Sequence, residues 1–139
     1  RYEILLENYS KSIHIESLTM QEMIRKDLTE GIVAYEKDLS KEVLQKKSLL
    51  GENSGALECG ILKELDSASA NMCTALLKLY EDTKTAESKT DALDTAKFYQ
   101  ETVLADMDEL RKYADQAEAL IPEKYLSYPT YGQMLFSLR

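Results

Sequence analysis

The residues best suited to catalysis or metal binding are scattered along this chain rather than grouped. His14 is the one histidine, and no carboxylate lies three or four positions from it. A di-iron carboxylate bundle uses the motif Glu-x-x-His twice, and this chain does not contain it once. We therefore interpret His14 as a surface or interface residue.

The other chemically capable residues also lack the necessary spacing. Cys59 and Cys73 lie in one predicted helix at a separation of about 21 Å, too far for a disulfide. We expect both to be buried or partly buried thiols in a reducing cytoplasm. No Cys/His cluster has zinc spacing, and no glycine-rich loop with a lysine could hold phosphate. The acidic residues from Glu101 to Glu118 are typical of a solvated helix face. We predict no catalytic residue, cofactor site or metal ligand in this chain.

Composition excludes several classes of partner. The net charge is −8, from 17 basic and 25 acidic residues, whereas nucleic-acid and anionic-membrane binders need basic surface. No apolar run reaches the roughly 18 residues of a transmembrane helix. We therefore expect a cytoplasmic protein that binds neither nucleic acid nor membrane.

Apolar residues at helical spacing predict three long helical segments, from about 2 to 50, 57 to 86 and 91 to 121. Gly31 predicts a kink or break between Leu28 and Ile32. Gly51 is placed to end the first segment, Asn53 or Ser54 to cap the second, and Ser88 or Thr90 to cap the third. The short link between the last two segments implies an antiparallel hairpin.

The predicted fold class is therefore all-α. It is a long-helix bundle in which the hairpin packs on a kinked or broken N-terminal helix, followed by an extended aromatic tail. We expect residues 1–121 to form the bundle and residues 122–139 an ordered strap of the same domain. The predicted central core of the hairpin comprises Leu65, Met72, Leu76, Val103, Met107 and Leu110.

Three apolar features remain after this core is assigned. One is a second stripe on the first helix, which includes Ile4, Ile15 and Leu18; another is Phe98, which points away from the main stripe of its helix. The third is the tail, which has too much apolar surface for a free polar end. The bundle could bury each of them, but we favour contact surface for other parts of the protein or other subunits. The predicted interface and anchor residues are Tyr128, Pro129, Tyr131, Leu135, Phe136, Phe98, Ile15 and Leu18.

Two stretches resemble type III glutamine synthetase, the large bacterial form of that enzyme. The first is Arg1-Tyr2-Glu3-Ile4, followed by Leu6-Glu7-x-Tyr9 and Ile13-x-Ile15-Glu16. The second is Tyr128-Pro129-Thr130-Tyr131-Gly132-x-x-Leu135-Phe136. The resemblance spans the whole chain, with specific motifs only at its two ends. It implies a C-terminal helical domain that packs on an upstream catalytic core.

The resemblance also implies what the parent protein does. That protein would join ammonia to glutamate with ATP and Mg²⁺ or another divalent metal, and it would assemble into rings of identical subunits. The chain opens in a helical pattern with no cap and no Met, which predicts a part of a longer protein. The competing readings are an independent helical interaction module and a helical metal or cofactor enzyme. The sequence upstream of Arg1 would distinguish the glutamine synthetase domain from the independent interaction module.

Overall fold

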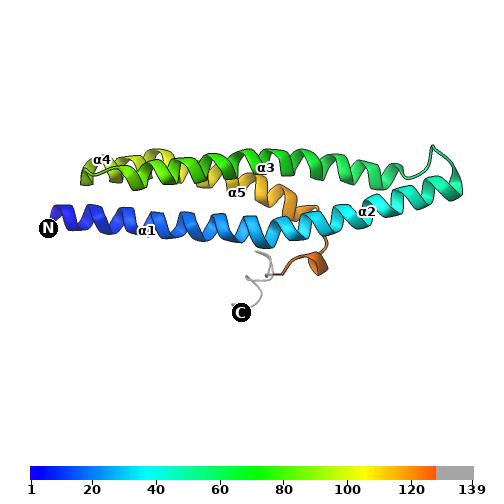
Figure 1. Cartoon of the computed structure of the whole chain (residues 1–139), viewed down its shortest axis with the longest axis horizontal. Helices are drawn as coiled ribbons and strands as arrows, with labels where there is room; N and C mark the ends of the chain where they lie inside the picture. Colours follow the sequence, from blue (N-terminus) through cyan, green and yellow to red (C-terminus); the bar gives the residue numbers. More distant parts are fainter. Residues whose placement is uncertain (128–139) are drawn as a thin grey trace.

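The structure, a computed structural model, describes residues 1–127, of which 89% are helical, with no strand among them. This confirms the predicted all-α class. The elements are α1 (Tyr2–Met23), η1 (Ile24–Leu28), α2 (Thr29–Leu50), α3 (Ala56–Ser88), α4 (Ala92–Phe98), η2 (Tyr99–Val103), α5 (Leu104–Ala119) and η3 (Glu123–Tyr125). They form a long rod in which α1 and α2 run along one side, with α3 and the α4–α5 helix beside them (Figure 1).

The sequence predicted a kink or break between Leu28 and Ile32, but the N-terminal helix continues through Gly31 without a break. Instead a π-helical turn, η1, begins seven residues earlier and joins α1 to α2 in one continuous rod. The extra residue of a π turn shifts the helix face, so that Ile24, Leu28 and Ile32 all reach the core. The Thr29 hydroxyl donates to the Ile24 carbonyl at 2.8 Å and satisfies a group at this irregular turn. Gly31 has a different role, described below.

The hairpin of α3 with α4 and α5 forms where predicted, and the predicted cap Gly51 is confirmed, whereas the N-caps of α3 and α4 differ from those predicted. Gly51 ends α2 with a φ of 101°, as expected for a glycine at this position. Gly55, at φ 81°, precedes α3, and neither Asn53 nor Ser54 caps that helix. The cap of α4 is Asp91, whose carboxylate accepts from the Asp94 amide at 3.0 Å, in place of the predicted Ser88 or Thr90.

The core follows α3 and the α4–α5 helix and contains five of the six residues predicted for it. The exception is Leu76, which is only partly buried, because the buried stripe of α3 passes through Ala75 and Leu79 instead. Tyr99 is also buried in this core. From α1, η1 and α2 the core receives Ile13, Met20, Ile24, Leu28 and Ile32.

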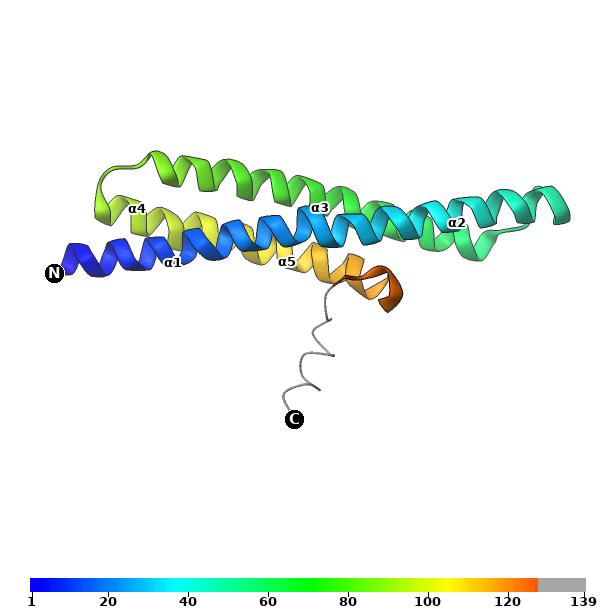
Figure 2. The same ribbon diagram turned by 60° about the horizontal axis from the view of Figure 1, so that its bottom comes forward.

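The bundle is not uniform along its length. The α5 helix ends at Ala119, so the far ends of α2 and α3 project beyond it as a two-helix hairpin (Figures 1 and 2). After the buried Ile121, the chain turns at Pro122 and places η3 against α2. The described part of the chain therefore ends beside the long N-terminal rod.

Candidate assembly surface

Among residues 1–127, no group of three or more His, Cys, Asp or Glu side chains could hold a metal ion. None of the helices in this range is long and apolar enough to cross a membrane. Cys59 is partly buried, as expected, whereas Cys73 is exposed, which the sequence did not predict.

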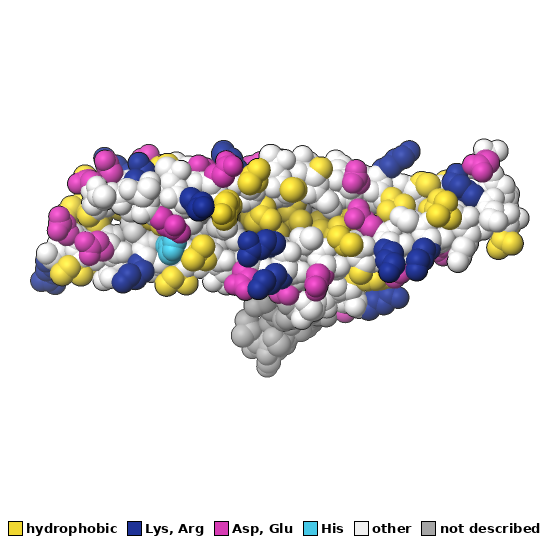
Figure 3. Space-filling model, viewed as in Figure 1, with side chains coloured by type: hydrophobic (Ala, Val, Ile, Leu, Met, Phe, Trp, Pro, Cys, Tyr) yellow, Lys and Arg dark blue, Asp and Glu magenta, His cyan; other side chains and the backbone are white. Residues whose placement is uncertain are grey.

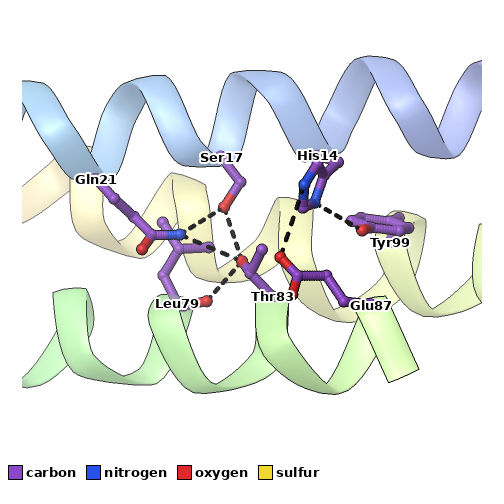
Figure 4. A network of polar contacts seen from close by, with 7 residues as sticks. All are labelled: His14, Ser17, Gln21, Leu79, Thr83, Glu87 and Tyr99. Atoms are coloured by element: carbon purple, nitrogen blue, oxygen red, sulfur yellow. Dashed lines mark hydrogen bonds and ion pairs between the residues drawn. The ribbon is translucent and has the colours of Figure 1, made fainter. Parts of the chain in front are cut away.

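His14 lies at a junction of three segments (Figure 4). Its Nδ1 is 3.1 Å from the Tyr99 hydroxyl in η2, and its Nε2 is 3.6 Å from the Glu87 carboxylate in α3. Burial, and to a lesser extent the nearby Glu87 charge, raises the pKa of the Tyr99 phenol. The carboxylate comes from another helix, so the search along His14's own helix could not find it. These two contacts attach α1 to α3 and to η2.

A second polar network lies one turn further along α1 (Figure 4). The Thr83 hydroxyl donates to the Leu79 carbonyl at 2.7 Å, so the Ser17 hydroxyl, 2.8 Å away, must donate to Thr83. The Gln21 amide in turn donates to Ser17 at 3.0 Å. All three polar side chains are buried and hydrogen-bonded. We therefore interpret the network as one that fixes the position of α1 along α3 rather than as a reactive site.

Two buried carboxylates were not found by sequence reasoning. Glu58, at the start of α3, pairs with Lys46 of α2, and the hydrogen bond from that ammonium holds the pKa of Glu58 below its usual range. Asp106 of α5 lies 3.5 Å from the Lys78 ammonium. Burial, followed by the interaction with Asp82, raises the pKa of Asp106 to about 6. Both ion pairs join side chains on different helices, so the periodicity of a single helix gave no signal for them.

A shallow groove of about 350 Å³ runs between α1 and α3. Its lining combines apolar Leu18 and Tyr80 with both signs of charge, from Glu22, Arg25, Lys84 and Glu87, together with Gln21 and Thr83. The buried Gln21 and Thr83 already form hydrogen bonds within the protein, because the Gln21 amide donates to Ser17 and to Thr83. The groove therefore offers no convergent set of unpaired polar groups for a small ligand.

The predicted second stripe of α1 is exposed. Ile4, Ile15 and Leu18 keep 60%, 57% and 45% of their surface accessible. Figure 3 shows hydrophobic side chains reaching the surface of the rod among charged ones. This exposure fits the predicted contact role without testing it. Phe98 differs, because it packs partly buried against the core with the Lys89 ammonium 4.9 Å above its ring.

A second apolar surface lies at the projecting end of α2 and α3, and sequence reasoning missed it. Leu44, Leu49, Leu50 and Leu57 are all largely exposed there. Leu57 is exposed because α5 ends before it can cover this part of α3. Among residues 1–127 no other helix covers these leucines, and this depends on the lengths of all the helices rather than on one apolar stripe.

Of the predicted tail anchors, Tyr128, Pro129, Tyr131, Leu135 and Phe136 lie outside the described residues. The described part of the strap contains Tyr125, whose hydroxyl donates to Asp38 Oδ2 at 2.5 Å. That hydrogen bond raises the pKa of Tyr125 to about 12. The strap is therefore attached to α2 before the predicted anchors begin.

The chain is similar to part of several known proteins. The family model for the glutamine synthetase C-terminal domain matches residues 1–47. A glutamine synthetase of Butyrivibrio fibrisolvens is 79% identical over the whole chain, which covers 20% of that protein. A type-3 glutamine synthetase of Dictyostelium discoideum is 27% identical over 98% of this chain, which corresponds to 19% of that protein.

A glutamine synthetase of Bacteroides fragilis is 25% identical over 99% of the chain, again 19% of the relative. The chain therefore spans about one fifth of the length of the curated relatives that it matches. No solved structure matches it significantly.

Proposed function

We infer that this chain, which belongs with the C-terminal domain of glutamine synthetases, supports and assembles that enzyme without taking part in its chemistry. The observation that carries the proposal is the exposed apolar stripe on α1. Such a stripe is costly on a surface that stays in water, because large exposed apolar side chains favour burial. A domain that spans one fifth of its relatives has a large partner available in the rest of the same protein.

The activity follows from the relatives. The complete protein would ligate ammonia to glutamate at the expense of ATP, with a divalent metal such as Mg²⁺. The ligands for ATP and metal would lie outside this chain. We propose the type III subclass, supported by the motifs at the two ends of the chain and by the similarity to the Dictyostelium type-3 enzyme. The working location would be the cytoplasm of a bacterium.

The partners we propose are the catalytic core of the same chain and further copies of the protein in a homo-oligomer. Ile4, Ile15 and Leu18 would contact one or other of them. The polar networks at His14 and Ser17 hold α1 in register on α3, so that the opposite face of α1 is presented as a fixed surface. We propose that the aromatic residues from Tyr128 to Phe136 anchor the chain end in the same assembly.

The test is made on the full-length protein. The double variant Ile15→Ser with Leu18→Ser should weaken assembly and lower glutamine formation, because it removes apolar contact area from the proposed interface. The matched control is Leu77→Ser on α3, which removes a leucine of similar exposure from another face. Oligomeric state is measured by light scattering, and activity by glutamine formed from glutamate, ammonia and ATP.

The outcomes separate the two parts of the proposal. If the double variant assembles and turns over like the wild type, the α1 stripe is not an interface. The buried carboxylate variant Asp106→Asn should leave the rate constant of the assembled enzyme unchanged. A specific loss of turnover in that variant, with assembly intact, would assign the chain a catalytic role and contradict the proposal.

A further inference from the structure

The carbonyl group of Tyr125 lies directly against the backbone of Gly31 on α2. A β-carbon built at residue 31 would be 2.6 Å from the Tyr125 carbonyl oxygen and 3.4 Å from its carbon. The first distance is shorter than real β-carbon contacts, and the crowding atoms belong to backbone, which cannot rotate away. Gly31 therefore provides a notch that any other residue would fill.

The Tyr125 side chain continues the contact along the same face of α2. Its ring centroid lies 5.0 Å from that of Tyr35, with the ring planes tilted by 45°. Its hydroxyl donates to Asp38, and the Lys124 ammonium lies 5.2 Å above the ring. Residues 31, 35 and 38 are spaced by four and three, so they form one surface of a helix. The notch at Gly31, the ring of Tyr35 and the carboxylate of Asp38 therefore all contact Tyr125.

We propose that Gly31, Tyr35 and Asp38 form a latch that closes on Tyr125, and that this Tyr125 latch determines where the C-terminal segment leaves the bundle. Gly31 acts as a positioning residue: it admits the Tyr125 carbonyl and so allows the ring to reach Tyr35 and Asp38. Ile121 is buried in the core, so the latch fixes the path of the chain four residues later.

The latch can open without unfolding the bundle. Asp38 is exposed, Tyr125 is partly buried, and η3 has only three residues. Regions with few buried contacts and exposed hydrogen bonds open locally, at lower free energy than global unfolding. Opening would free residues 123–127 from α2 while the core stays packed. The state of the latch would thus decide whether residues 123–127 stay on α2 or are released.

The test uses the full-length protein in its native assembly. Trypsin cleaves after Lys124 only when the latch is open, and cleavage after Lys89, in the α3–α4 link, is the internal reference. Hydrogen exchange of the peptide covering residues 123–127 gives a second, protease-free measure of opening. The variants are Gly31→Ala and Tyr125→Phe. The matched control is Gly60→Ala, because Gly60 is also helical but has no atom near an added β-carbon.

We expect Gly31→Ala and Tyr125→Phe each to raise cleavage after Lys124 and exchange at residues 123–127 by roughly tenfold. Cleavage after Lys89 should not change, and Gly60→Ala should match the wild type at both sites. Wild-type rates in both latch variants would overturn the proposal, and so would an equal rise in Gly60→Ala. If circular dichroism shows that Gly31→Ala fails to fold, the Tyr125→Phe result decides alone.

Discussion

Asp106 shows how a single residue of this bundle responds to its environment. It is a buried carboxyl beside Asp82, with the partly compensating Lys78 ammonium at 3.5 Å, and its pKa is raised to about 6 from an ordinary value of 3.8. A raised pKa means that the folded state binds the proton more tightly than the unfolded state. The contribution to stability is therefore complete below pH 3.8 and is lost as pH rises through about 6.

This sign gives a prediction for Asp106→Asn. The amide cannot ionise, so the variant should gain stability relative to the wild type, and the gain should be about 1 kcal/mol larger at pH 8 than at pH 5. Urea unfolding at the two pH values measures it. Asp108→Asn, an exposed neighbour on α5, serves as control and should show no such pH-dependent gain. An equal effect of Asp106→Asn at both pH values would contradict the assignment.

Polar residues at the contact between α1 and α3 find hydrogen-bond and ion-pair partners on other helices. Ser17, Gln21 and Thr83 satisfy one another in the core, and His14 meets Glu87 and Tyr99. Along its own helix, His14 has no carboxylate three or four positions away. Side chains that are 66 to 85 positions apart cannot be paired from periodicity alone.

At the level of helices, the line of buried residues along α3 determines which of its leucines lie in the core. Leu79 is fully buried, whereas Leu76, predicted as central core, is only partly covered. The buried positions 65, 68, 72, 75 and 79 follow spacings of three and four, and residue 76 lies one position off this line. The sequence pattern located the stripe but not its edge, because an apolar residue next to a stripe reads like a member of it.

We predict that Leu79→Ala costs about 2–5 kcal/mol of unfolding free energy, as expected for a cavity in a packed core. Leu76→Ala should cost clearly less, because solvent can reach the site and the neighbouring side chains can relax. Thermal or urea unfolding of the two variants compares them directly. Equal losses would mean that Leu76 is as much a core residue as Leu79.

For the whole molecule, the proposed assembly involves the C-terminal segment as well as the α1 stripe. Two truncations separate its described and undescribed parts: one removes residues 128–139, and the other removes residues 123–139 together with the latch. We expect the longer truncation to lower the melting temperature of the chain below that of the shorter one, since it also removes the Tyr125 contacts with α2.

In the full-length protein, both truncations should weaken assembly if the aromatic residues beyond Ser127 act as anchors. Differential scanning calorimetry measures the first effect and light scattering the second. Identical melting temperatures for the two truncations would show that the latch adds nothing to stability. Normal assembly of the shorter truncation would remove the proposed role of Tyr128, Tyr131, Leu135 and Phe136.

Several properties of this protein could be determined from the sequence alone. Helical periodicity predicted an all-α bundle, and the structure of residues 1–127 confirms it. The end motifs predicted the relationship to the C-terminal domain of glutamine synthetase, which the comparisons confirm. These inferences succeed because periodicity and motifs are local, so each can be read from residues that are close along the chain.

Tertiary structure alone decided the rest. The sequence predicted a kink or break between Leu28 and Ile32, whereas the helix continues there and Gly31 admits the Tyr125 carbonyl, a contact between residues 94 positions apart. The π turns, the buried Glu58 and Asp106, and the uncovered leucines beyond the end of α5 likewise depend on where separate helices meet. Such features arise from the close approach of distant segments, and a helical pattern records only which face a residue occupies, not what is packed against it.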